Sequence, residues 1–194
     1  MTTIPGWLQQ EVNDYFKAPL GIPSPATVLD IGANIGAFSV RAHQEWPAAK
    51  IICYEPMPFN IELLRQNVSS DWCRIVPCAV RAQAGEDDIF IGDMFVTGGF
   101  AKGVRQTDRT IRVNCAAAGE IPSCEVVKID TEGCEVEILE NLRLDKTQAI
   151  MLEHHSKADA ATIKQMLMPP FRIVYDESDR EIGTMIFVRQ GAFD

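Results

Sequence analysis

The chain has 194 residues, of which 46% are hydrophobic and 23% charged, and its formal net charge is −9. This length and composition predict one globular domain with a sizeable core. The negative charge argues against a nucleic-acid partner, because such proteins usually carry a basic face. No apolar stretch approaches the ~20 residues that cross a bilayer. The first residues lack a basic region followed by an apolar core, so we expect neither a membrane span nor a signal peptide.

Six cysteines are scattered along the chain without a C-x-x-C pair. Their spacing fits neither a zinc site nor a disulfide framework. We therefore expect free thiols in a protein of the reducing cytoplasm.

Short β-rich runs alternate with helical stretches after a lead-in of helix and loop over residues 1–25. The expected elements are, in chain order, strand 27–32, helix 37–46, strand 50–56, helix 59–68, strand 74–80, strand 125–130, helix 134–142, strand 148–155, helix 161–168 and an antiparallel pair, 171–176 and 184–190. Strands that alternate with helices imply right-handed crossovers and a mostly parallel sheet with helices on both faces. We predict a single α/β domain over residues 1–194.

Residues 86–113 interrupt this alternation. The runs "DDIFIG" and "RTIRVN" flank the glycine-bearing stretch "VTGGFAKG", and no helical pattern lies between them. We predict an inserted β-hairpin here. Its loop either overhangs a functional site or belongs to a surface hairpin without function, and the pattern leaves both open.

Acidic side chains stand at four of the ends of the five predicted parallel strands. The residues at these ends are Asp30; Glu55; Cys78 and Ala79; Asp130; and Glu153, His154 and His155. A single carboxylate at such a place is equally well explained as a helix cap. Ligands of open α/β sheets bind outside the carboxyl ends of the strands, so acids at four ends together predict a site.

The first strand leads into the glycine loop of "VLDIGANIGAFSV". Gly32 and Gly36 permit unusual backbone angles and close approach of a ligand, and Asn34 tolerates the left-handed region. The loop reads G-x-N-x-G and lacks the G-x-G-x-x-G spacing that seats a diphosphate. It favours a cofactor whose adenosine and amino-acid parts pass beside it. Glu55, in "YEP", stands where an acid accepts ribose hydroxyls.

The stretch "KIDTEG" places a charged residue inside an apolar strand. Lys128 needs a carboxylate partner there, and Asp130 lies two residues on, with its side chain on the same face. The pair is either a structural ion pair at the rim of the sheet or part of a polar cluster that fixes Asp130 or an acceptor hydroxyl. Glu132 begins the next helix, where an acid is favourable in any case.

These motifs together resemble a known family. "VLDIGANIGAFS", "CYEPMPFN", "PCAV", "VVKIDTEGCEVEIL" and "IMLEHH" are similar, in order, to the motifs of the FkbM-type methyltransferases, which use S-adenosylmethionine. The resemblance runs from about Ala26 to His155, and "KIDTEG" is its most specific part. It implies a seven-stranded, Rossmann-like class I methyltransferase sheet with an antiparallel final strand. It also implies O-methylation of a hydroxyl on a sugar, polyketide or related small metabolite.

The resemblance also implies roles for single positions. The amino-acid end of the cofactor would lie along the first loop, the ribose at the end of the second strand, the adenine at the third and the methyl group at the fourth. The implied residues are Asp30, Gly32, Ala33, Asn34 and Gly36; Glu55 and Pro56; Cys78 and Ala79; and Asp130 and Glu132. Glu153 and His155 match an acid-x-His ending of the fifth strand. His154 stands where an aliphatic residue is usual, which leaves open which histidine faces the site.

An alcohol is a poor nucleophile at neutral pH, so its methylation benefits from a general base. We hypothesise that His155 or His154 takes the hydroxyl proton, assisted by Glu153, while Asp130 orients the acceptor. The acids and histidines are metal-ligand types, but no tight spacing demands an ion, and we predict none. Two rival functions stay open: an NAD-dependent Rossmann oxidoreductase, and a non-catalytic cofactor-binding module. The sequence does not choose between a small-molecule and a glycan acceptor.

Overall fold

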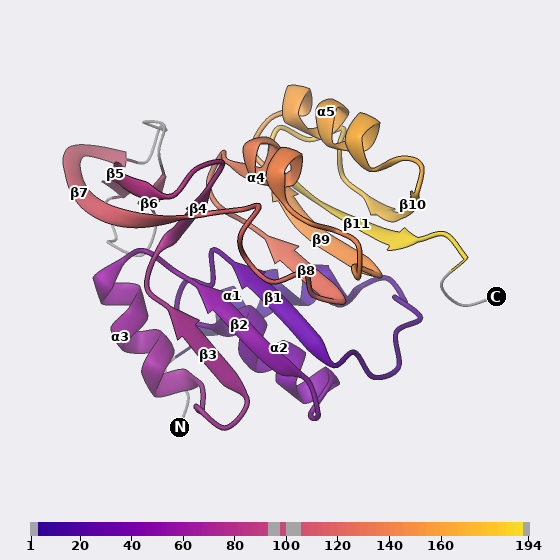
Figure 1. Ribbon diagram of the computed structural model, residues 1–194, viewed down its shortest axis with the longest axis horizontal. Coiled ribbons are helices and arrows are strands. Elements are labelled where there is room, and N and C mark those ends of the chain that lie inside the picture. Colours follow the sequence, from indigo (N-terminus) through magenta and orange to yellow (C-terminus); the bar gives the residue numbers. More distant parts are fainter. Residues whose placement is uncertain (1–3, 93–97, 100–105, 192–194) are drawn as a thin grey trace.

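Seven strands form one sheet in the computed structural model, in the order β10-β11-β9-β8-β1-β2-β3 (Figure 1). The structure describes residues 4–92, 98–99 and 106–191. The strands are β1 (Thr27–Ile31), β2 (Lys50–Tyr54), β3 (Cys73–Val76), β8 (Val126–Ile129), β9 (Ala149–His154), β10 (Phe171–Asp176) and β11 (Gly183–Arg189). Only β11 runs antiparallel to its two neighbours. The predicted seven-stranded, mostly parallel sheet with an antiparallel final strand is confirmed.

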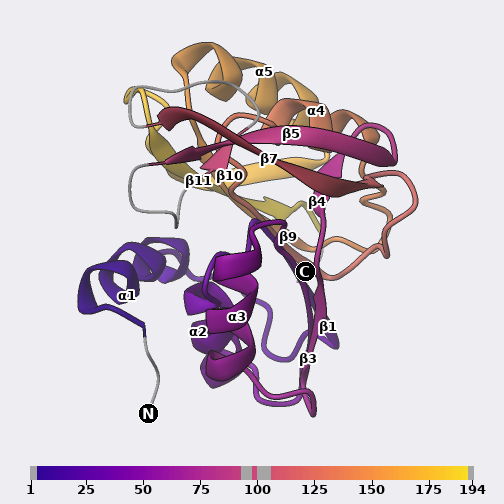
Figure 2. The ribbon, with the colours of Figure 1, turned by 90° about the vertical axis from the view of Figure 1, so that its left-hand side faces the viewer.

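Helices cover both faces of this sheet. They are α1 (Gly6–Val12), the 3-10 helix η1 (Asn13–Phe16), α2 (Ala37–Glu45), α3 (Pro58–Asn67), α4 (Glu135–Asn141) and α5 (Lys157–Leu167). Helices α4 and α5 pack on one face, and α1, α2 and α3 on the other (Figures 1 and 2). Helix α5 begins earlier than the predicted 161–168, because the hydroxyl of Ser156 caps it by accepting from the Asp159 N–H. No helix among the described residues is long and apolar enough to cross a membrane.

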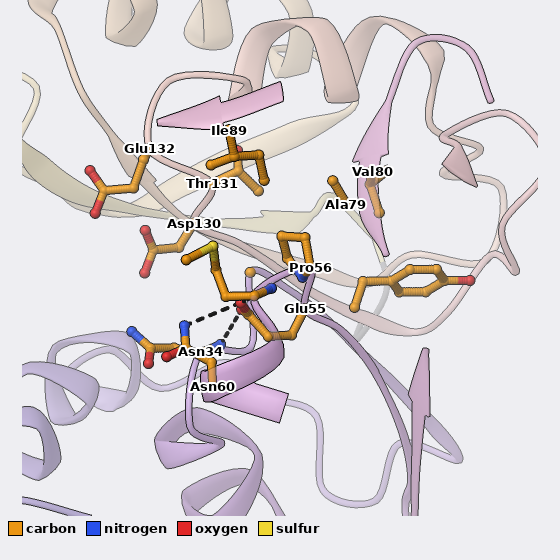
Figure 3. A pocket seen from close by; sticks show the side chains of 13 residues that line it. Asn34, Glu55, Pro56, Asn60, Ala79, Val80, Ile89, Asp130, Thr131 and Glu132 are labelled. Atoms are coloured by element: carbon orange, nitrogen blue, oxygen red, sulfur yellow. Dashed lines mark hydrogen bonds between the residues drawn. The ribbon is translucent and has the colours of Figure 1, made fainter. Parts of the chain in front are cut away.

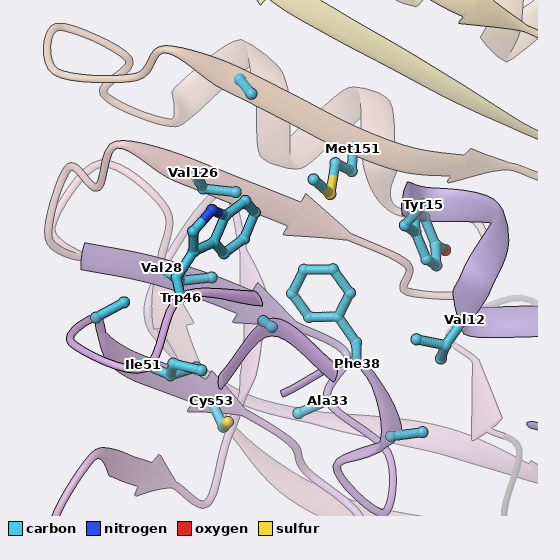
Figure 4. Close-up of a cluster of buried hydrophobic side chains, with 14 of the residues drawn as sticks. Val12, Tyr15, Val28, Ala33, Phe38, Trp46, Ile51, Cys53, Val126 and Met151 are labelled. Atoms are coloured by element: carbon cyan, nitrogen blue, oxygen red, sulfur yellow. The ribbon is translucent and has the colours of Figure 1, made fainter. Parts of the chain in front are cut away.

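The alternation of side chains along each strand divides the core in two. Val28 points toward the α1–α2–α3 side, where it joins Phe38, Trp46 and Met151 (Figure 4). Its neighbour Leu29 joins the cluster beneath α4 and α5. Each such fully buried side chain stabilises the fold by roughly 1.5–3 kcal/mol. The sheet is therefore fixed from both faces, and its carboxyl edge is left for polar residues.

The insert forms a second sheet beside α4. Its strands are β4 (Ala79–Arg81), β5 (Gly85–Gly92), β6 (Gly98–Gly99) and β7 (Gln106–Ala117), in the order β4-β7-β5-β6. Strands β5 and β7 pair antiparallel, which confirms the predicted hairpin. Most of its predicted loop, residues 93–97 and 100–105, lies outside the described residues.

The prediction of one strand over residues 74–80 is wrong. Strand β3 ends at Val76, and β4 begins at Ala79 in the other sheet, where it runs parallel to β7. Pro77 lies between them and has no N–H to offer to a neighbouring strand. The chain therefore leaves the main sheet at the proline, and this crossing brings Ala79 to the carboxyl edge.

Candidate active site

The loop after β1 is held tightly against the ends of β2 and β8. Gly32 and Asn34 both adopt left-handed backbone angles, with φ of 75° and 51°. The N–H groups of Gly32 and Ala33 both donate to the carbonyl of Tyr54, at 3.0 Å. A Cβ atom on Gly32 would lie 1.7 Å from the main-chain oxygen of Asp130, so only glycine fits there.

A cavity of about 620 Å³, its open mouth included, lies beside this loop (Figure 3). The residues that line it are Gly32, Asn34, Tyr54, Glu55, Pro56, Met57, Asn60, Ala79, Val80, Ile89, Asp130, Thr131 and Glu132. Seven of them were predicted site residues, and the structure brings these together from four strand ends. Six of them were missed from the sequence, and most of these are apolar or aromatic residues of types typical of a core: Tyr54, Met57, Asn60, Val80, Ile89 and Thr131. Ile89 comes from β5, so the inserted hairpin contributes a wall.

Glu55 is almost fully buried at the centre of one wall. Its carboxylate accepts hydrogen bonds from the Asn34 N–H at 2.8 Å, the Met57 N–H at 2.9 Å and the Asn60 side-chain amide at 3.2 Å (Figure 3). Burial nevertheless outweighs these bonds and raises the pKa of Glu55. A carboxylate has about four acceptor positions, so about one is left for a ligand hydroxyl.

Lys128 joins the loop to Asp130 from below. Its ammonium donates to the Gly32 carbonyl at 2.7 Å and lies 3.3 Å from Asp30 Oδ1 and 3.5 Å from Asp130 Oδ2. Burial lowers the pKa of Lys128, but the two aspartates outweigh it and raise that pKa. The partner in the neighbouring strand, Asp30, was not foreseen. Lys128 thus forms a structural ion pair with Asp30 and also holds Asp130 in position. The structural ion pair and the polar cluster around Asp130, which the sequence left as alternatives, are therefore one arrangement.

Four predicted cofactor residues lie away from the lining of this cavity. Asp30 is fully buried and accepts from the Ser39 hydroxyl at 2.7 Å, so it supports the loop from beneath. Gly36 begins α2, and a Cβ atom there would meet Leu64 at 2.5 Å. Ala33 and Cys78 are buried in the core clusters, and Cys78 only adjoins the lining residue Ala79.

The two neighbouring histidines, the last residue of β9 and the residue after it, point in opposite directions. His154 is fully buried, and its Nε2 lies 3.3 Å from the carbonyl of Glu177. His155 points the other way, with Nε2 3.5 Å from Glu132 Oε2 and 4.0 Å from Glu153 Oε2. Side chains alternate along a strand, so Glu153 shares a face with His155. The placement removes His154 from the cluster, and we carry only His155 forward as a candidate base.

Glu135, which the sequence reasoning missed, holds His155 from behind. It is 1% exposed, and its Oε1 accepts from the N–H groups of Thr131 and Gly133 at 2.9 and 3.1 Å. His155 Nδ1 lies 3.3 Å from the same oxygen. Burial raises the pKa of Glu135, but His155 and these donors outweigh it and lower that pKa. The stretch "TEGCEVE" could have indicated Glu135, because this acid lies only three residues after the predicted site residue Glu132.

The acids around His155 crowd one another. Burial, followed by repulsion from Asp130, raises the pKa of Glu153 to about 8. Burial disfavours the charge on His155, but Glu135, Asp130 and Glu132 outweigh it and raise the pKa of His155 to about 9. The cluster therefore retains protons that isolated side chains would release. Asp130, Glu153 and His155 each offer a ligand atom within 4.8 Å of the others, close enough to share one metal ion.

Several solved structures that resemble this fold are described as methyltransferases. The precorrin-6y C5,15-methyltransferase of Geobacter metallireducens matches with a TM-score of 0.51 at 13% identity, over 96% of this chain and 89% of that one. The ribosomal protein L11 methylase of Lactobacillus delbrueckii matches with a TM-score of 0.54 at 11% identity, over 94% and 77%. The chain has the Rossmann-like fold of class I methyltransferases.

The sequence comparisons define the family within that class. The model of the methyltransferase FkbM domain matches residues 30–168, and the chain belongs to this family. The hexuronic acid methyltransferase AglP of Haloferax volcanii is 25% identical over 145 residues, 71% of this chain and 59% of that protein. The 31-O-demethyl-FK506 methyltransferase FkbM of Streptomyces tacrolimicus is 31% identical over 116 residues, 57% and 45%. The chain thus matches less than two thirds of the length of either relative.

Proposed function

We propose that this protein transfers a methyl group from S-adenosylmethionine to a hydroxyl of a sugar, polyketide or related small molecule. The observation that carries the proposal is the cavity between Gly32, Glu55 and Asp130, which opens beside a cluster of carboxylates around His155. Membership of the FkbM methyltransferase family supports the reaction class.

The residues present fit this methyl donor at its nucleoside and at its sulfonium. Ala79, Val80 and Ile89 offer apolar surface to a flat purine, and the remaining acceptor position of Glu55 suits a ribose hydroxyl. When bound, the donor supplies a sulfonium-activated methyl group for in-line displacement. Asp130 lies at the edge of the same cavity, where its negative charge favours a cationic centre.

His155 is the residue that we assign to the proton of the acceptor hydroxyl. Its Nδ1 is directed to Glu135, which leaves Nε2 facing Glu132 and Glu153 on the side of the site. With a pKa of about 9, the imidazole is mostly protonated at pH 7. A positive charge in the cavity lowers the pKa of His155, because it repels the imidazolium, and lowers the pKa of Glu153, because it stabilises the carboxylate. A base in this position typically contributes ~10² to 10⁴-fold to the rate.

The class of acceptor comes from the relatives. One is named for a hexuronic acid and the other for 31-O-demethyl-FK506, so both names describe an oxygen-bearing acceptor. We propose the same broad class here.

The six buried cysteines are free thiols, two of which, Cys53 and Cys73, have sulfurs only 3.2 Å apart. This supports a reducing compartment such as the cytoplasm.

Calorimetry with S-adenosylhomocysteine and with NAD separates the donor from its rival. We expect S-adenosylhomocysteine to bind and NAD not to bind; binding of NAD alone would refute the proposal in favour of an oxidoreductase. Release of S-adenosylhomocysteine on a panel of glycosides and alcohols then distinguishes an enzyme from a binding module. Asp130→Asn should lower turnover at least tenfold with little loss of donor affinity. The exposed Asp145→Asn is the matched control and should change neither quantity.

A further inference from the structure

Tyr15 joins the N-terminal part of the chain to the residue that follows strand β8. It belongs to the 3-10 helix η1, and its side chain is 4% exposed. Its hydroxyl donates to Asp130 Oδ2 at 3.4 Å. Tyr15 precedes residue 30, where the match to the family model begins. Asp130 is therefore contacted by a residue from outside the part of the chain that defines the family.

Aromatic packing on helix α2 fixes the ring of Tyr15. The ring meets Phe38 edge-on, with the ring centroids 5.7 Å apart and 85° between the ring planes (Figure 4). The next residue, Phe16, stacks on the same ring with the centroids 5.6 Å apart. Edge-on and stacked pairs are the arrangements that aromatic rings favour. The place of the Tyr15 hydroxyl is thus set by the core.

Two donors converge on the same oxygen of Asp130. Lys128 Nζ lies 3.5 Å from Asp130 Oδ2, the atom that also accepts from Tyr15. Lys128 is itself fixed by the Gly32 carbonyl and by Asp30. Among the described residues, no hydrogen bond reaches the second oxygen, Asp130 Oδ1. The carboxylate is held by Oδ2 and can offer Oδ1 to the cavity that Asp130 lines.

The hydroxyl of Tyr15 keeps its proton at neutral pH. Burial, followed by repulsion from Asp130 and Glu153, raises the pKa of Tyr15 well above its usual value of about 10. The phenol therefore acts as a hydrogen-bond donor to the carboxylate. At 3.4 Å the contact is long for a hydroxyl donor, and such contacts in active sites commonly tighten in the complex with substrate.

We propose that Tyr15 is a positioning residue for methyl transfer: together with Lys128 it fixes Oδ2 of Asp130, so that Oδ1 faces the place where the methyl group is transferred. The proposal rests on the proposed function, which puts the reacting groups beside Asp130. Because its side chain is almost fully buried, Tyr15 acts through Asp130 and not by binding the donor itself.

Two analogues of the donor test this role without an acceptor. S-adenosylhomocysteine lacks the methyl group. In sinefungin, a carbon that carries an ammonium replaces the sulfonium, so a charged hydrogen-bond donor stands where the methyl group would be. A correctly placed Asp130 Oδ1 accepts from this ammonium. Calorimetry should show that Tyr15→Phe lowers the preference for sinefungin over S-adenosylhomocysteine at least threefold, with the affinity for S-adenosylhomocysteine changed less than twofold.

Turnover and two further variants complete the test. With the acceptor of the panel that the wild-type protein methylates fastest, Tyr15→Phe should lower kcat at least threefold. In Asp130→Asn, which has no carboxylate to position, adding Tyr15→Phe should lower neither kcat nor the preference for sinefungin any further. Tyr175→Phe is the matched control, because it removes a phenol hydroxyl that donates to Glu177 at 2.8 Å, and it should change neither quantity.

The outcomes separate a positioning role from its alternatives. An unchanged preference or an unchanged kcat in Tyr15→Phe, or a further loss in the Asp130→Asn background, would overturn the proposal and leave the hydroxyl with a structural role. Equal losses of affinity for both analogues would also overturn it, because they would place Tyr15 at the amino-acid end that the analogues share. Failure of S-adenosylhomocysteine to bind the wild-type protein would refute the proposed function, and the role of Tyr15 with it.

Discussion

Replacing Glu135 with glutamine should lower the pKa of His155. The substitution keeps the shape of the side chain and a carbonyl oxygen that can still accept from Thr131 and Gly133, so the fold should survive. What is lost is the negative charge 3.3 Å from His155 Nδ1. This charge is what orients the imidazole and favours its protonated form.

The size of the effect follows from the state of His155 in the structure. Its pKa is raised from 6.5 to about 9, which corresponds to about 3 kcal/mol in favour of the charged ring. Glu135 contributes most to this increase, ahead of Asp130 and Glu132. We therefore expect the pKa in Glu135→Gln to fall to about 8 or below, a loss of about 1.4 kcal/mol or more.

Proton NMR titration of the imidazole rings measures this directly, because the chain has only three histidines. The signal that disappears in His155→Gln identifies the residue. Glu137→Gln is the matched control on the same helix, since Glu137 pairs with Arg81 instead. A wild-type His155 that titrates near 6.5, or an identical pKa in Glu135→Gln, would refute the reasoning. The methylation rate should also rise with pH toward 9, and its acidic limb should move to lower pH in Glu135→Gln.

Four further predictions concern stability and metal dependence. Gly32→Ala should lower the unfolding free energy by about 4 kcal/mol or more in urea titrations, because the added Cβ would overlap a main-chain oxygen at the end of β8. Gly6→Ala is the control and should cost nothing, because the space around Gly6 is open. Equal stabilities of the two variants would contradict the close packing of the loop. Lys128→Met should cost about 3–5 kcal/mol by leaving the buried Asp30 uncompensated, and adding Asp30→Asn should recover part of the loss; no recovery would speak against the pair. Glu153→Gln should stabilise the protein, because the raised pKa means that charging Glu153 costs stability progressively from pH 4.5 to about 8. The gain in urea should be on the order of 1–3 kcal/mol at pH 7 and close to zero at pH 4, and a gain that does not depend on pH would rule out this cause. Chelation with EDTA should leave the methylation rate unchanged, and a loss that Mg²⁺ restores would instead assign an ion to the carboxylates around His155.

Local patterns in the sequence were enough to predict the main sheet. Strands such as β1 and β2 are short apolar runs bounded by turn residues, and the acid at the end of β2 follows directly from this placement. Pro77 was the exception, because its missing N–H redirected the chain in a way that the apolar run "RIVPCAV" conceals. The strand pattern also supports a prediction that the sequence analysis did not make, which concerns the two histidines. The alternation along β9 separates His154 from His155 once the ends of the strand are known.

The site depended on contacts that no local pattern carries. Asp30 lies opposite Lys128 on the neighbouring strand, and the Tyr15 hydroxyl, 115 residues away in sequence, donates to Asp130 at 3.4 Å. The sequence offered Asp130 as the nearest partner of Lys128, and only the strand register shows the second one. Helix α1 was predicted as part of a lead-in, and its place near Gly32 and Asp130, with which Glu11 lines a cavity, required the tertiary structure.

The central claim is that the cavity beside the glycine loop holds the methyl donor. A crystal structure of the protein with S-adenosylhomocysteine tests it most directly. We expect the ribose on Glu55, the purine against Ala79 and Ile89, and the sulfur directed toward Asp130 and the cluster around His155. Ligand density elsewhere on the protein, or a cavity that stays empty at saturating ligand, would contradict the account.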